Sequence, residues 1–174
     1  MNELTHPLLI HFPLALTFIL PFIVIYTIYL EKFKEQDKNQ IWYFTIFIMF
    51  VISLFSLLSV FTGEMGEEIL EKFIPEKHIE NHEELGELFA IVNYILMAIS
   101  IIVLFIPKKV RIFVMIAFLI LNLTSVILAI KVGSSGGSLI YEHNAANYLI
   151  KNKKDLPPQS SKQIKESDDD DIDE

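Results

Sequence analysis

The chain has 174 residues, 52% of them hydrophobic, and its mean hydropathy of +0.45 is too high for an ordinary soluble domain. It has no cysteine, which excludes disulfides, cysteine-held iron–sulfur clusters and covalently attached c-type haem. The net charge is −8, but residues 155–174 contribute −6 of it, with eight acidic residues against two lysines. We expect this acidic tail to be disordered.

Four apolar stretches follow one another along the chain, and each approaches the ~20 residues that a helix needs to cross a bilayer. None has a Lys or Arg in its interior. We therefore predict an all-α membrane protein, with a four-helix transmembrane bundle in residues 1–154. The predicted spans are Leu8–Leu30, Ile41–Thr62, Leu85–Ile106 and Ile112–Ile130.

The first span begins with "THPLLIHFPLALTF", residues 5–18. Pro7 fits the first turn of a helix, where the missing N–H would be unpaired anyway. His6 and His11 then lie at the start of the span, and Pro21 is expected to kink its middle. The stretch lacks a basic n-region and a small-residue cleavage site, so we interpret it as a retained span and not as a signal peptide.

The lysines predict the orientation of the bundle. The loop between spans 1 and 2 carries three lysines, and the loop between spans 3 and 4 carries Lys108, Lys109 and Arg111. The positive-inside rule places these loops in the cytoplasm of a bacterial inner membrane. Both termini are then expected on the periplasmic or outer side.

All five histidines fall on that same predicted outer side. Pro75 is suited to the first turn of the third helix, which places His78 and His82 one turn apart on one face. Gly86 continues this face toward the membrane. Small and polar residues at helical spacing also mark the faces that turn inward. These residues are Ser56, Ser59 and Gly63 in span 2, Ala90 and Asn93 in span 3, and Asn122, Ser125 and Ala129 in span 4.

The segment after the fourth span is rich in glycine. Gly133, Gly136 and Gly137 predict a turn with positive φ angles, followed by a short interfacial segment that brings Tyr141 and His143 back toward the membrane surface. No G-K-[ST] follows the glycines, so they do not match a phosphate-binding loop. We expect no nucleotide site and no nucleic-acid partner.

Four motifs now occur in a recognisable order. They are "HPLLIHFPLAL", "TGE" after span 2, a histidine that enters span 3, and "GGSLIYEHN" after span 4. In this order the chain resembles the bacterial membrane family catalogued as domain of unknown function 2231 (DUF2231). The resemblance runs from Thr5 to Asn147, and its most specific parts are His-Pro followed by His-Phe-Pro, and Gly-Gly-x-Leu-[Val/Ile]-Tyr-x-His. Asn144 replaces a glycine that is usual in the family.

The resemblance implies a role in membrane electron transfer. Members of that family have four spans, and related domains occur fused to Rieske-type or c-type cytochrome modules, so a redox partner of either type is implied. His6 and His82 match the family's more persistent histidines, whereas His11 and His143 match positions that some relatives replace. His78 matches no motif position, and we expect it to be a surface residue.

We hypothesise a b-type haem held between helices at the outer side. Such a haem needs two axial ligands on opposite faces of a flat ring, and small residues must leave room for it. The residues assigned to this site are the candidate ligands His6, His11, His82 and His143, together with Gly63, Gly86 and Tyr141.

Two alternatives stay open. The same four histidines could hold a Zn, Cu or Fe ion, with Glu64, Glu83 or Glu84 as oxygen ligands. They could instead be structural, in a subunit of a membrane redox complex. No nucleophile–base pair is visible, which favours an electron carrier or subunit over a stand-alone enzyme. Lipid contact is predicted for every span, and a homo-oligomer is open.

Overall fold

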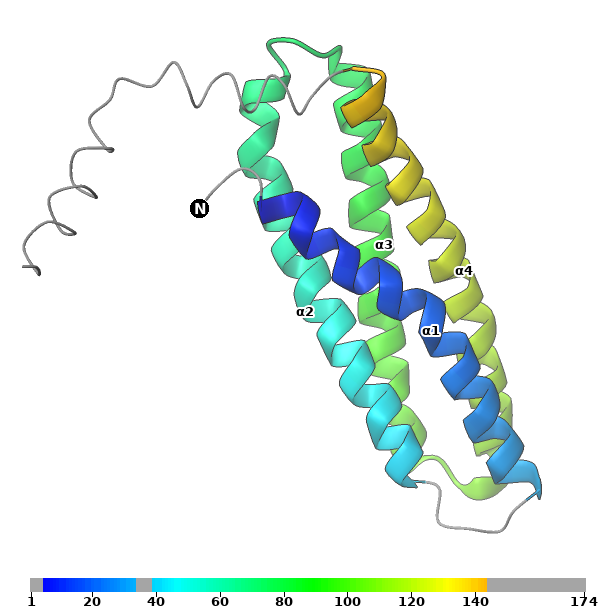
Figure 1. Cartoon of the computed structure of the whole chain (residues 1–174). Helices are drawn as coiled ribbons and strands as arrows, with labels where there is room; N and C mark the ends of the chain where they lie inside the picture. The colour runs from blue at the N-terminus through cyan, green and yellow to red at the C-terminus, as the bar shows by residue number, and fades with distance from the viewer. Residues whose placement is uncertain (1–4, 34–38, 144–174) are drawn as a thin grey trace, which may run out of the picture.

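The computed structural model describes residues 5–33 and 39–143, with side chains except at 5–8, 39 and 64–69. The described chain is all-helical, and four long helices dominate it (Figure 1). They are α1 (Thr5–Phe33), α2 (Asn39–Leu70), α3 (Glu76–Ile102) and α4 (Lys108–Tyr141), with the short 3-10 helix η1 (Val103–Phe105) after α3. All four are long and apolar enough to cross a membrane, which confirms the predicted four-span fold.

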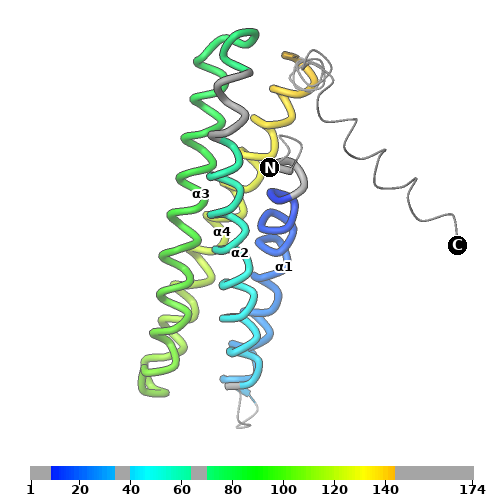
Figure 2. Tube along the Cα trace, turned by 90° about the vertical axis from the view of Figure 1, so that its left-hand side faces the viewer, coloured from blue at the N-terminus to red at the C-terminus, as the bar shows by residue number. Residues whose placement is uncertain are grey.

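The helices pack as an up-down-up-down bundle in which each contacts its two sequence neighbours and α4 closes onto α1. The connection between α2 and α3 lies at the same end as the start of α1 and the end of α4 (Figures 1 and 2). We call this the histidine end, because all five histidines lie in or next to helix turns there. The opposite end, with Lys108 and Lys109, is the lysine end.

The helix α1 begins well short of the tip of the histidine end. In both views α2, α3 and α4 continue beyond the first turn of α1 (Figures 1 and 2). The outermost part of the bundle is therefore built by three helices. There Ile74 and Ile79 pack with Leu139 of α4, so the connection between α2 and α3 is fastened to the end of α4.

Prolines define where two of the helices begin. Pro75 directly precedes α3 and Pro107 directly precedes α4, each with extended backbone geometry. This agrees with the predicted start of the third helix. Pro13 and Pro21 lie inside α1, which continues through both. The Thr17 hydroxyl donates to the Pro13 carbonyl at 2.7 Å, so it is satisfied within its own helix.

The predicted turn after the fourth span is wrong. The helix α4 continues through Gly133, Gly136 and Gly137 to Tyr141, and none of these glycines has a positive φ. Glycine lowers helix stability by only about 1 kcal/mol relative to alanine, and packing of Leu139 can offset this. Tyr141 is the last residue of this helix and does not belong to a separate segment after it. Residues beyond His143, including the predicted acidic tail, lie outside the described residues.

Two apolar clusters fill the bundle, with buried polar residues between them. The lysine-end cluster contains Leu20, Val24, Trp42, Ile48, Met49, Ile52, Leu96, Val103, Met115 and Phe118. The histidine-end cluster contains Phe89, Leu128, Ala129 and Val132. The polar layer between them is Thr17, Ser56, Asn93, Asn122 and Ser125, each at most 3% exposed. The inward orientation predicted for Ser56, Asn93, Asn122 and Ser125 is thereby confirmed.

The outer surface of the bundle is apolar along the helices. Large side chains such as Phe22, Phe47 and Phe113 are more than half exposed, and they lie on the outer surface of the helices between the two ends of the bundle. A soluble protein does not carry so many exposed aromatic side chains, whereas lipid tails solvate them well. These side chains are in contact with lipid when the helices span a membrane.

Candidate functional site

His82 is the histidine most firmly integrated into the bundle. It projects from α3, is half-buried, and its Nδ1 lies 2.8 Å from Ser135 Oγ on α4. The Ser135 hydroxyl has one hydrogen, and it donates this to the Val132 carbonyl at 3.0 Å. When the Ser135 hydroxyl donates to Val132, its Oγ accepts from His82, and this arrangement corresponds to the imidazole tautomer with the proton on Nδ1. In the neutral ring the lone pair then belongs to Nε2.

The ring of His82 packs against the backbone of α4 at Gly136. A Cβ atom placed on Gly136 would lie 3.0 Å from His82 Cε1, closer than ordinary van der Waals contact. An alanine at this position would therefore require the imidazole to move by a few tenths of an ångström. Ser135 was not among the predicted site residues. Small residues facing a histidine of another helix are the signal that could have revealed it.

Three other glycines near the histidine end are surrounded by open space. A Cβ atom on Gly86, Gly133 or Gly137 would meet no heavy atom of the described residues within 4 Å outside its own helix backbone. Gly86 lies one turn along α3 from His82, and Gly137 directly follows the glycine under its ring. Packing within the chain therefore does not require glycine at these three positions. Gly63, the other predicted glycine, is half-buried near the end of the apolar part of α2.

Among the described side chains, the other histidines do not form a group of three or more ligands with His82. His11 is exposed on α1, and His6 lies in the first turn of that helix with its side chain outside the described ones. His143 instead pairs with His78, their ring centroids 4.3 Å apart and their planes inclined by 39°. His78 is exposed, as expected for a surface residue, but its pairing with His143 was not predicted. Tyr141 is 87% exposed.

A preformed multi-ligand metal centre does not appear among the described side chains. No three His, Cys, Asp or Glu residues there are grouped so that they could hold a metal ion. Glu64 belongs to the segment whose side chains are not described, whereas Glu84 is exposed. Within the described part of the chain, His82 contacts Ser135 of α4, and the rings of His78 and His143 form a separate pair.

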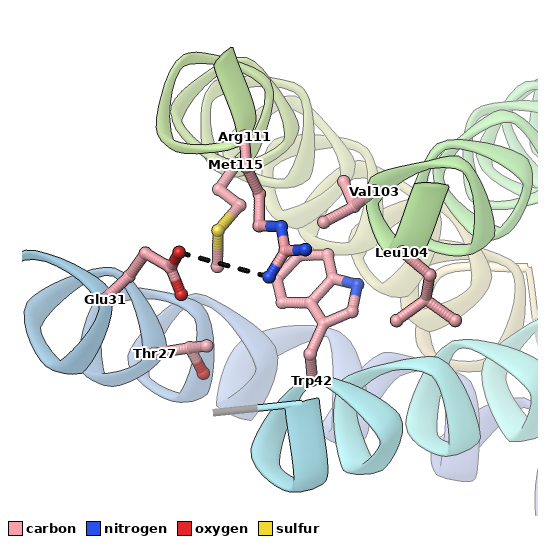
Figure 3. A pocket seen from close by; sticks show the side chains of 7 residues that line it. All are labelled: Thr27, Glu31, Trp42, Val103, Leu104, Arg111 and Met115. Carbon is pink, nitrogen blue, oxygen red and sulfur yellow. Dashed lines mark ion pairs between the residues drawn. The ribbon is translucent and has the colours of Figure 1, made fainter. Parts of the chain in front are cut away.

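A small cavity of about 10 Å³ lies at the lysine end (Figure 3). Its lining comes from α1, α2, η1, and α4, and includes Thr27, Glu31, Trp42, Val103, Leu104, Arg111 and Met115. Arg111 Nη1 lies 4.0 Å from Glu31 Oε1, and both side chains are at most 15% exposed. The sequence did not single out this pocket, because its residues come from distant parts of the chain.

A family model described as "Predicted membrane protein (DUF2231)" matches residues 4–148, most of the chain. No curated protein and no solved structure matches this chain. The matched range contains all four helices and every histidine, as the motifs "HPLLIHFPLAL" and "GGSLIYEHN" predicted. The chain belongs to the DUF2231 family of predicted membrane proteins.

Proposed function

We propose that this protein is a membrane electron carrier that binds b-type haem at its histidine end, with His82 as one axial ligand. The observation that carries the proposal is the hydrogen bond between His82 Nδ1 and Ser135 Oγ. With the Ser135 hydroxyl donating to Val132, the proposal assigns to His82 the tautomer whose Nε2 holds the lone pair. Histidines that ligate metals commonly donate their other ring N–H to such a partner.

The open space around the glycines supports a flat ligand at the same end. Gly86 and Gly137 are both half-buried and present no Cβ to a ring approaching His82. A bound haem supplies one-electron redox chemistry, and its axial ligands tune the potential. The chain's own contribution is to orient His82 through Ser135 and to keep the neighbouring backbone clear of side chains.

The second axial ligand is proposed to come from α1. This helix packs against α4, and it carries His6 and His11 in its first turns. His143 is the weaker candidate, since its ring is engaged with that of His78. The site would face the periplasm or cell exterior of a bacterial inner membrane, as the lysines at the other end favour. A cytochrome or Rieske-type protein would be its redox partner there.

A transition-metal ion is the second candidate, and the pair of His78 and His143 favours it. Two imidazoles suit Zn, Cu or Fe, but a structural zinc site uses four ligands. Further ligands would have to come from side chains outside the described ones or from a second copy of the chain. A purely structural role for the histidines, in a subunit of a redox complex, is the remaining alternative.

The test is a dithionite-reduced minus oxidised visible spectrum of the full chain, purified in detergent from a haem-replete host, with metal analysis of the same sample. We expect sharp α and Soret bands and about one iron per chain. His82→Ala should abolish the bands, whereas His78→Ala, at an exposed position outside the motif, should leave them unchanged. A flat wild-type spectrum would overturn the haem proposal, and stoichiometric zinc or copper would support the second candidate.

Gly137→Ala provides a further check that does not alter a ligand. The added methyl meets no described atom within 4 Å outside its own helix backbone, so the protein should fold with unchanged or slightly raised stability. If the open space accommodates the ring, haem content falls while the yield of folded protein does not. Full haem content in this variant would show that the space beside Gly137 is not used.

A further inference from the structure

The polar layer occupies one level of the bundle on all four helices. On each helix it begins one turn beyond a residue of the lysine-end cluster: Ser56 follows Ile52 and Asn122 follows Phe118, while Asn93 precedes Leu96 and Thr17 precedes Leu20. Beyond the layer, Phe89 and Leu128 belong to the histidine-end cluster. Apolar side chains therefore close the layer on both sides along the bundle axis.

Asn122 lies near the middle of the membrane-spanning part of α4. The charged residues that flank it in the sequence are Arg111 and Lys131. The helical distance between these two is about 30 Å, close to the thickness of the hydrocarbon core, and Asn122 is roughly 17 Å from the first of them. Asn122 is therefore too far from either membrane surface to be in contact with bulk water.

Most polar groups of the layer have partners within the chain. Asn93 donates from Nδ2 to its own helix at the Phe89 carbonyl, at 2.8 Å. Its Oδ1 accepts from Ser125 Oγ at 3.1 Å, which links α3 to α4. The Thr17 hydroxyl donates to the Pro13 carbonyl. These three residues show how the layer can be satisfied by protein groups alone.

Asn122 does not follow this pattern. It is 0% exposed, yet neither its Nδ2 nor its Oδ1 has a hydrogen-bond partner among the described residues. Ser56 on α2 is 3% exposed, and its Oγ also lacks a partner there. Unlike Asn93, the Asn122 amide does not bond to the carbonyl one turn back in its own helix. Because the bundle covers it completely, the amide faces the interior between the helices.

We infer that the polar layer binds internal water, with Asn122 and Ser56 as its principal protein ligands. A buried amide without partners is destabilising in an apolar medium, and buried water typically satisfies such groups with about three hydrogen bonds. A neutral ligand is favoured over a cation, because the described layer contains no carboxylate to compensate a charge. The layer is separate from the proposed haem site, since the histidine-end cluster lies between them.

The direct test observes the water by NMR. The full chain is labelled with ¹⁵N-asparagine in detergent micelles, and the Asn122 side-chain signal is assigned by its loss in Asn122→Gln. We expect a cross-peak between water protons and the Nδ2 hydrogens, with the rotating-frame sign of direct contact and not of proton exchange. Exposed Asn81 is the positive reference. A cross-peak for Asn81 with none for Asn122 would overturn the inference.

Thermal unfolding gives an independent test, because the two possibilities predict opposite changes in the Tm of the Asn122→Leu variant. If water bridges the layer, Asn122→Leu leaves that water and Ser56 with fewer partners and lowers Tm by roughly 3–10 °C. If Asn122 is dry and unpartnered, the same substitution removes a buried polar group and raises Tm. Thr124→Val is the control, because Thr124 is exposed on the same helix and should change Tm little. Should Asn122→Leu fail to fold, the change in Tm of Ser56→Ala provides the same test: a decrease supports bound water and an increase contradicts it.

Discussion

Trp42 Nε1 donates a hydrogen bond of 2.8 Å to the carbonyl oxygen of Ser100, and this bond ties α2 to α3 near the lysine end. The indole is 3% exposed and meets the Phe118 ring edge-on, with centroids 5.5 Å apart. Its position beside Arg111 and Met115 is visible in Figure 3. Trp42 thus contacts two neighbouring helices and the pocket lining at once.

We expect Trp42→Phe to lower the free energy of unfolding by about 1–3 kcal/mol, since it removes the only donor of the indole and part of its volume. The measurement is the unfolding midpoint in mixed micelles of mild detergent and SDS. Tyr43→Phe is the matched control, because Tyr43 is 55% exposed and should change nothing measurable. Equal midpoints for the two variants would mean that the Trp42–Ser100 contact contributes little.

Gly136→Ala should destabilise the protein, whereas Gly133→Ala should not. The methyl group at 136 would lie 3.0 Å from His82 Cε1, so the imidazole must give way by a few tenths of an ångström, which strains its contact with Ser135. At 133 the methyl meets no described atom within 4 Å outside its own helix backbone, and replacing a helical glycine there should stabilise by about 0.5–1 kcal/mol. Thermal unfolding of both variants measures the difference, and the His82 side-chain NMR signals report the shift. A Gly136→Ala protein as stable as Gly133→Ala would contradict the packing described for His82.

The ion pair between Arg111 and Glu31 should contribute modestly to stability. Its 4.0 Å separation is long, although both side chains are largely buried. A double-mutant cycle with Arg111→Gln and Glu31→Gln is expected to give a coupling energy of about 0.5–1 kcal/mol, and the value should fall as salt increases. A coupling that is zero at low salt would show that the two groups do not stabilise each other.

The orientation of the bundle can be read by cysteine labelling, because the natural chain has no cysteine. Lys72→Cys places a thiol between α2 and α3, and Lys109→Cys places one at the start of α4; both positions are exposed. In intact cells a membrane-impermeant maleimide should label Lys72→Cys but not Lys109→Cys, as the positive-inside rule predicts. Labelling of both after lysis is the control. The reverse pattern in intact cells would place the histidine end in the cytoplasm.

Hydropathy by itself determined the four helices, their order and the common end of the histidines, because helix formation in an apolar span is a local property. Small and polar residues such as Ser56 and Asn122 also marked the inward faces correctly, since lipid does not solvate them. The continuation of α4 was not predicted from its glycines, because packing of Leu139 on Ile74 and Ile79 joins segments that are distant in the sequence.

Only the tertiary structure decided which side chains meet. The helices are apolar on nearly every side, because lipid and core accept the same residues, so the pattern of hydrophobic residues does not define how each helix is rotated. That rotation places Ser135 and Gly136 against His82, pairs His143 with His78, and leaves the Asn122 amide without a hydrogen-bond partner among the described residues. The sequence by itself determined that the histidines lie at one end of the bundle, and the packing of four helices decided which of their side chains meet which partners.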